Sequence, residues 1–443
     1  MIISKVHEFG WSLYLKRHDD RPSFTLKLTR KRWSPLDQVR YLVMSDRCWN
    51  QPKFYARPLS HPWHSKLQPI LALSASMLLV AAGLTIYVYR VTDSFSLTND
   101  GAPGMSYEGS YSFTDNRSEI TSLTFIPCDH SERMVAVGFE NGRVDRVLLL
   151  PFPKAQDEKQ PLSLTLEPTS TLTSRAMDLV ESLSCSDNML LSLSSSGTAG
   201  ICNLSSESPL VGAIDLDWRS WTSFLCMRSS TPFAAFGTTS PNPLVVHAAT
   251  PAGLSPTPFA ILHSTRERST AVYGITGAPP SAPWGSSRQV IVSGWYDGAV
   301  RVHDMRSARR SSGVSGSPAP LRPMLTLRDP WSDEPIYSVS CGGGSSSFVA
   351  AGTARHSVVA FWDVRRPTEG WSVHAPGNDS SPVYSLILES SRLFGVTQSR
   401  PFVFDFGPGV TKRTYPSLPH RDSLQLNEDG IGYRVAEYNH SRR

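Results

Sequence analysis

The feature that most constrains this fold is a pattern of short apolar runs that recurs along the 443 residues. Each copy has one apolar run, a second run that ends near a glycine, a tight turn and a third run. Seven copies occur, at residues 70–91, 119–150, 178–204, 223–249, 271–306, 336–365 and 383–407. Further short runs follow most copies and are expected to be fourth strands, at 105–113, 162–168, 209–216, 257–263 and 323–329.

A four-stranded sheet on its own would leave two apolar faces in water. Seven such sheets packed around an axis bury both faces of every sheet and leave only short, protected edges. The sequence therefore predicts an all-β fold, a seven-bladed β-propeller over residues 67–443, with a short, partly helical segment over residues 1–66. The last copy has no fourth run, so residues 54–59 or 431–438 are expected to complete it.

The tract from residue 67 to residue 89 has no charged side chain and lies between Lys66 and Arg90. As a helix, its 23 residues would reach about 34 Å, enough to cross a bilayer. Serine, glycine and threonine divide it into pieces of strand length, and its end is rich in β-branched and aromatic residues. We interpret it as the first copy of the repeat, with a single-pass membrane helix as the less favoured alternative.

Charge distinguishes the N-terminal segment from the rest of the chain, and cysteine usage indicates the cellular compartment. Residues 1–66 contain 13 Lys and Arg against 5 Asp and Glu, whereas the remainder contains 30 against 33. The six cysteines are scattered, with no CxxC pair, which indicates reduced thiols. We therefore expect a cytoplasmic or nuclear protein without a signal peptide, and neither nucleic acid nor a membrane as partner.

Two copies of the repeat resemble the WD-repeat family. Residues 290–306 (VIVSGWYDGAVRVHDMR) and 348–365 (FVAAGTARHSVVAFWDVR) carry its strand, turn, strand and terminal aromatic-Asp pattern, with Trp362-Asp363 in the position that names the family. The Gly-His pair that usually opens each WD repeat is missing. Asn141-Gly142 and Asp297-Gly298 suit two-residue hairpin turns.

The resemblance implies a protein-interaction function, with partners bound by the loops between the second and third strands. In this sequence those loops contain Phe139, Glu140, Asn141, Trp295, Tyr296, Asp297, Arg355, His356, Gln398 and Arg400. Trp295 and Tyr296 are the strongest candidates, because large aromatic residues are common at interface hot spots. The alternatives are that Trp295 packs against its own blade and that Asp297 only forms the turn.

The N-terminal segment has its own local signals. Ser34-Pro35 followed by Asp37 predicts a capped helix over residues 35–47, and residues 23–30 (SFTLKLTR) alternate like an edge strand. Four tryptophans indicate that this segment packs against the rest of the chain: Trp11, Trp33, Trp49 and Trp63.

Residues 10–49 and 56–63 resemble the connector of fungal F-box/WD-repeat proteins. Those proteins are substrate receptors of cullin–RING (SCF) ubiquitin ligases, and their F-box docks on the adaptor Skp1. The resemblance implies the same role here, with an F-box expected upstream of Met1. A WD-repeat scaffold without a ligase link is the alternative.

No catalytic, cofactor or metal signature is found in the sequence. GxSxG, HExxH, GxGxxG and GxxxxGK are absent, and no His/Cys cluster has zinc spacing. We therefore expect no catalytic residue, no bound cofactor and no metal, and a protein that is not an enzyme.

Overall fold

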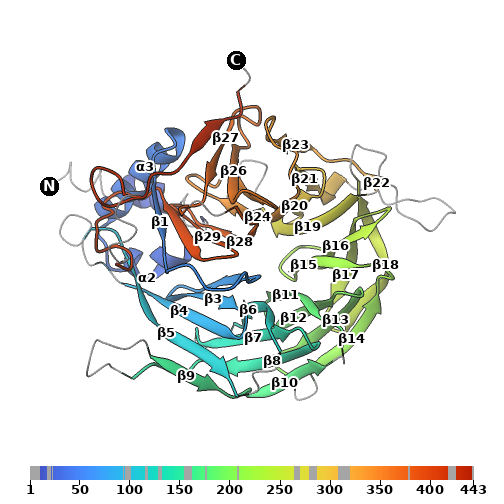
Figure 1. The fold of residues 1–443 in the computed structure, drawn as a ribbon. Coiled ribbons are helices and arrows are strands. Elements are labelled where there is room, and N and C mark those ends of the chain that lie inside the picture. The colour runs from blue at the N-terminus through green and yellow to red at the C-terminus, as the bar shows by residue number, and fades with distance from the viewer. Residues whose placement is uncertain are drawn as a thin grey trace.

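The repeats form a ring of blades in the computed structural model (Figure 1). The structure describes residues 10–16, 21, 23–92, 94, 101–114, 118–127, 132–153, 162–174, 177–206, 209–263, 270–278, 287–307, 320–377, 380–417 and 426–441. Within these residues, seven antiparallel four-stranded units surround a central channel. The predicted all-β propeller class is confirmed.

The first four blades follow the chain from its N-terminal third. Blade one contains β2 (Ile70–Leu73), β3 (Met77–Ala82), β4 (Thr85–Val91) and β5 (Met105–Phe113). Blade two contains β6 (Ile120–Phe125), β7 (Met134–Phe139), β8 (Arg143–Leu148) and β10 (Ser170–Ser174). Blade three contains β11 (Val180–Ser186), β12 (Met189–Ser194), β13 (Thr198–Asn203) and β14 (Leu210–Asp215). Blade four contains β15 (Ser220–Cys226), β16 (Phe233–Ser240), β17 (Leu244–Thr250) and β18 (Gly253–Leu262).

The last three blades complete the ring. Blade five contains β19 (Thr270–Gly277), β20 (Val290–Trp295), β21 (Ala299–Asp304) and β23 (Leu325–Arg328), with the short helix η2 (Met305–Ser307) after β21. Blade six contains β24 (Ile336–Gly342), β25 (Phe348–Thr353), β26 (Val358–Asp363) and β27 (Gly370–His374). Blade seven contains β28 (Val383–Leu388), β29 (Arg392–Thr397), β30 (Pro401–Asp405) and, from the N-terminal segment, β1 (Tyr55–Pro58).

The ring is closed by β1, which pairs antiparallel with β30 in the register Ala56↔Phe404. Of the two segments expected to complete blade seven, the one at residues 54–59 does so. The C-terminal strand β31 (Glu437–Asn439) instead adds a fifth strand to blade six, beside β27. The two ends of the chain therefore cover the edges of neighbouring blades.

One predicted fourth strand belongs to a different blade. The run at 162–168 forms β9 (Ser163–Leu166), which pairs parallel with β5 of blade one. The outer strand of blade two is β10, and β22 (Pro320–Leu321) extends blade four in the same parallel manner. The assignment of residues 162–168 to blade two was wrong, because a local apolar pattern does not specify which edge a strand joins.

The uncharged tract at residues 67–89 forms sheet. It contains β2, β3 and most of β4, which pair in sequence, and every residue of β3 is buried. The membrane-helix alternative is thereby overturned. Among the described residues, no helix is long and apolar enough to cross a membrane.

Helices from the N-terminal segment lie across the base of blades six and seven. They are η1 (Phe24–Leu26), α2 (Lys27–Arg30) and α3 (Pro35–Asn50). The predicted helix is confirmed: the Ser34 hydroxyl accepts the Asp37 N–H at 3.1 Å and Pro35 is the first helical residue. The edge strand predicted at 23–30 was wrong, because this stretch forms η1 and α2 and buries Thr25, Leu26 and Thr29.

Buried contacts fix these helices, here called the cap (residues 21–53), to the base of the ring. The Trp49 ring stacks on Phe406 with centroids 3.6 Å apart, and its Nε1–H donates to the carbonyl oxygen of Ser390 at 2.8 Å. The backbone N–H of Thr25 donates to Glu389 Oε1 at 2.8 Å. Burial raises the pKa of Glu389, although Thr25 donates two hydrogen bonds to its carboxylate.

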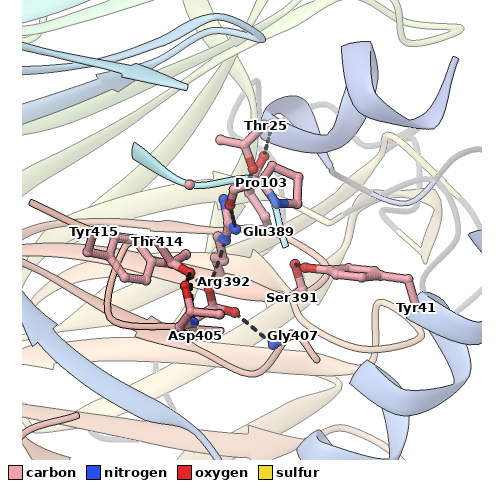
Figure 2. A network of polar contacts seen from close by, with 12 residues as sticks. Thr25, Tyr41, Pro103, Glu389, Ser391, Arg392, Asp405, Gly407, Thr414 and Tyr415 are labelled. Carbon is pink, nitrogen blue, oxygen red and sulfur yellow. Dashed lines mark hydrogen bonds and ion pairs between the residues drawn. The ribbon is translucent and has the colours of Figure 1, made fainter. Parts of the chain in front are cut away.

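An ion pair lies at the base end of blade seven, beside the cap (Figure 2). Arg392 and Asp405 are both fully buried, and Nε of the arginine is 3.1 Å from Oδ2 of the aspartate. Tyr415 donates a hydrogen bond to the same oxygen, and the Gly407 N–H donates to Oδ1 at 2.7 Å. The arginine also donates to the carbonyl oxygen of Pro103. These contacts join blade seven to the connection between β4 and β5 of blade one.

A buried histidine in blade five makes the stability of the fold depend on pH. His303 is fully buried and its Nε2–H donates to the carbonyl oxygen of His263 at 3.1 Å. Burial lowers the pKa of His303 to about 4, whereas an unfolded chain has a histidine pKa near 6.5. Between these values the unfolded state binds a proton that the folded state excludes, so stability falls as pH is lowered.

We expect His303 to contribute a loss of up to about 3 kcal/mol in the free energy of unfolding between pH 7 and pH 4. Urea unfolding of the wild type and of His303→Gln at several pH values measures it. The glutamine amide can still donate to His263 but does not titrate, so its stability should depend less steeply on pH. Equal pH dependence in the two proteins would show that His303 does not exclude the proton.

Candidate protein-interaction face

One end of the ring gathers two sets of loops. The hairpin between the second and third strands of each blade lies beside the start of the first strand of the same blade. For example, the Tyr296 N–H donates to the carbonyl oxygen of Ala271 at 2.9 Å, and the Ala354 N–H donates to that of Pro335 at 2.9 Å. We call this end the upper face; the cap lies on the opposite end, the base.

The first strands of the blades contact one another in a ring and line the central channel: β2, β6, β11, β15, β19, β24 and β28. Six of these strands carry a β-bulge near the upper face, where two residues oppose one on the neighbouring strand. The residue inserted by each bulge lines the channel: Thr121, Glu181, Trp221, Tyr273, Tyr337 and Tyr384. Bulges commonly redirect a side chain in this way.

Four of these side chains are aromatic and come from consecutive blades, four to seven. Centroid distances are 5.0 Å for Trp221–Tyr273, 5.1 Å for Tyr273–Tyr337 and 6.1 Å for Tyr337–Tyr384. We call this row, Trp221, Tyr273, Tyr337 and Tyr384, the aromatic collar. All four are partly exposed, so their rings are both supported by their neighbours and accessible from the upper face.

Polar groups fix the two ends of the aromatic collar. The Arg219 guanidinium lies 4.0 Å from the centroid of the Trp221 ring and forms a 2.9 Å ion pair with Glu181. Burial raises the pKa of Glu181, and Arg219 opposes that rise. At the other end, Gln398 Nε2 donates to Tyr384 Oη at 3.1 Å. Burial raises the pKa of Tyr273 and of Tyr384, so both phenols remain protonated.

Two large exposed side chains lie on the same face, one beside the aromatic collar and one towards the rim of blade six. Tyr296 is 55% exposed, and the centroid of its ring is 6.2 Å from the centroid of the Tyr273 ring. Trp331, in the connection to blade six, is 60% exposed. Beside Trp331 lies a groove of about 970 Å³ lined by Glu334, His356 and other residues. The upper face therefore combines an aromatic centre with a groove towards the rim of blade six.

The predicted loop residues differ in how far they are exposed to solvent. Glu140, Tyr296, Arg355 and His356 are exposed, and Asn141 and Gln398 are partly exposed. Of these, Tyr296 and Gln398 contact the aromatic collar. The backbone N–H of Arg355 and Nδ1 of His356 both hydrogen-bond to the Glu334 carboxylate, at the groove.

Three predicted residues cannot contact a partner directly, because they are buried. Phe139 packs edge-on against Phe113, with ring centroids 5.2 Å apart. Arg400 is only 4% exposed. Trp295 is fully buried and donates Nε1–H to Ser293 Oγ at 2.8 Å. The alternative in which Trp295 packs against its own blade is the one observed, and its selection as a contact residue is corrected.

Asp297 supports the turn instead of presenting a free carboxylate. It accepts hydrogen bonds from Arg301 at 2.7 and 3.0 Å and from Arg328 at 2.8 Å. Burial alone would raise the pKa of Asp297, but these two guanidinium groups outweigh burial and lower it. Its role in the hairpin turn, given as the alternative, is the observed one.

The aromatic collar itself was missed in the sequence. Its signal is visible in the aligned copies, where Val272-Tyr273, Ile336-Tyr337 and Val383-Tyr384 begin units five, six and seven in the same way. The resemblance to WD-repeat proteins implies contacts in the hairpin loops, not in the first strands. Among the described residues, no group of three or more His, Cys, Asp and Glu side chains is arranged to hold a metal ion.

Comparison with known proteins supports the fold. The crystal structure of the WD40 β-propeller domain of Doa1 superposes with a TM-score of 0.53 at 12% identity, covering 79% of this chain and 97% of that one. This chain has a WD40-type propeller fold. No protein-family profile and no curated protein sequence matches it. The likeness at this identity concerns the fold alone.

Proposed function

We propose that this protein is a protein-interaction module without enzymatic activity, which binds a protein partner on its upper face through the aromatic collar. The observation that supports this most directly is the contiguous row Trp221, Tyr273, Tyr337 and Tyr384, held partly exposed in the channel near the upper face. Tryptophan, tyrosine and arginine are enriched among interface hot spots, and rigid rings lose little conformational entropy on binding. The exposed Tyr296 extends the same surface.

The double variant Tyr337→Ala/Tyr384→Ala is expected to reduce recovery of partners at least tenfold in quantitative affinity purification of the full chain. Loss of a hot-spot aromatic typically costs about 2 kcal/mol or more, equivalent to over tenfold in affinity. Both rings are partly exposed, so the melting temperature should change little.

A matched control is Tyr107→Ala, which removes an exposed tyrosine from β5, away from the upper face. Partners recovered equally by the wild type and by both variants would place binding elsewhere on the molecule. If the double variant loses its partners and also melts at a much lower temperature, Tyr→Phe variants, which keep the rings and the fold, separate the two effects. Partner binding by the Tyr→Phe variants close to the wild-type level supports the proposal.

The narrower proposal is that the module recognises substrates for an SCF ubiquitin ligase in the cytoplasm or nucleus. It rests on the resemblance of residues 10–49 and 56–63 to F-box/WD-repeat connectors. Reconstitution with purified Skp1 and cullin tests it, using the natural gene product. A stable complex with other proteins but not with Skp1 would favour the scaffold alternative, while leaving the proposal for the aromatic collar intact.

A further inference from the structure

The cap on the base carries a strongly basic surface. Residues 21–53 contain eight Lys and Arg against two carboxylates, Asp37 and Asp46. Six of the basic side chains are exposed: Lys27, Lys31, Arg32, Arg40, Arg47 and Lys53. Neither carboxylate is exposed to the same degree, and Asp46 forms a 2.9 Å ion pair with Arg21. The outward charge of the cap is therefore almost entirely positive.

Large apolar side chains stand among these charges. Phe24 is 49% exposed, Leu28 37%, Val43 49% and Met44 50%. On α3, Arg40, Val43, Met44 and Arg47 follow the three- and four-residue spacing that puts side chains on one face of a helix. Four partly hydrated apolar side chains in so small a segment need an explanation beyond packing.

The opposite side of the cap is the side that packs on the propeller. On α3, Tyr41, Leu42, Ser45 and Trp49 are buried, and Trp49 reaches the base of blade seven. On η1, Thr25 is buried and bonded to Glu389 of the same blade. The exposed basic and apolar residues of both helical stretches therefore face away from the ring, towards solvent.

We infer that this outer cap face (Phe24, Lys27, Leu28, Lys31, Arg32, Arg40, Val43, Met44 and Arg47) binds an anionic membrane surface. Basic side chains attract the negative headgroups, and apolar side chains between them insert at the level of the headgroups. Nucleic acid would satisfy the charges but offers no apolar environment to Leu28, Val43 and Met44. This inference is independent of the proposed function, since the upper face lies at the other end of the ring.

Binding of the full chain to vesicles tests the inference. Vesicles of phosphatidylcholine with 0, 20 or 40% phosphatidylserine are sedimented with the protein at several salt concentrations. Binding should rise with phosphatidylserine and fall with salt, because the attraction is electrostatic. Both Arg40→Ser/Arg47→Ser and Val43→Ser/Met44→Ser should weaken binding at least tenfold.

The control Arg355→Ser removes an exposed charge from the upper face and should bind vesicles within twofold of the wild type. Absence of binding to any vesicle would overturn the inference. A double-stranded DNA oligonucleotide provides the other outcome. Tighter binding to DNA than to vesicles, with Val43→Ser/Met44→Ser unchanged, would show a nucleic-acid surface and would also overturn it. Partner recovery by the aromatic collar should be unaffected in every cap variant.

Discussion

Replacing Arg392 with alanine is expected to lower the free energy of unfolding by about 3–5 kcal/mol, a large share of the total for a domain. The substitution leaves Asp405 fully buried without the guanidinium that neutralises it. Removing one partner of a buried ion pair is costly, because the remaining charge has been taken out of water without compensation. The substitution also removes the hydrogen bond to Pro103, which joins blade seven to the connection between β4 and β5 of blade one.

Urea unfolding of the wild type and of Arg392→Ala measures this loss. Arg366→Ala is the matched control, since Arg366 and Glu369 form an exposed pair 3.6 Å apart with side chains 74% and 68% exposed. Exposed pairs contribute little to stability, so the control should unfold like the wild type. A loss below about 1 kcal/mol in Arg392→Ala would contradict the expectation that Asp405 depends on the guanidinium for its burial.

The blades were predictable because their physical signal is local and repeated. The second strand of each blade is buried on both faces, so it appears as a largely apolar run, as in β3 (MLLVAA) and β25 (FVAAGT). Seven copies of this signal outweigh the resemblance of any one copy to a membrane helix. The positions of the hairpins at Asn141-Gly142 and Asp297-Gly298 were predicted, but the two-residue turns were wrong. Each loop has three residues, at 140–142 and 296–298, and within it only the glycine has a positive φ.

The two misassigned elements, residues 23–30 and β9, take their structure from contacts with distant parts of the chain. In residues 23–30 the apolar positions alternate, but the inward residues are Thr25, Leu26 and Thr29, at helical spacing. Thr25 faces inward because Glu389, 364 positions away, accepts its hydrogen bonds. Likewise, β9 joins blade one by a parallel pairing that its own four residues do not encode.

Tertiary context also explains why the loop residues of the candidate site were predicted and the aromatic collar was not. Loop position indicated Tyr296 and Gln398, and both contact the aromatic collar. The collar depends on bulges, which turn Tyr273, Tyr337 and Tyr384 into the channel instead of between the blades. A bulge is a property of the strand pairing, so a single strand read alone gives no indication of it.

Deletion of residues 1–60 is expected to destabilise the protein by more than about 5 kcal/mol, which is comparable to the whole stability of an ordinary domain. The deletion removes β1 and so exposes the edge of β30, whose residues are all buried. It also removes Trp49, whose ring is 1% exposed and stacks on Phe406. Loss of a buried tryptophan alone typically costs about 3–5 kcal/mol. The truncated chain should therefore aggregate or lack a cooperative melting transition.

Deletion of residues 437–443 is the matched control, because it also removes a terminal strand. That strand, β31, is a fifth strand added to the already complete blade six, and its three residues are largely exposed. Its loss should cost less than the loss of β1, which is the fourth strand of blade seven. Scanning calorimetry of both truncations measures the difference. A monodisperse 61–443 fragment that melts cooperatively near the wild-type temperature would show that β28, β29 and β30 close the ring without the N-terminal segment.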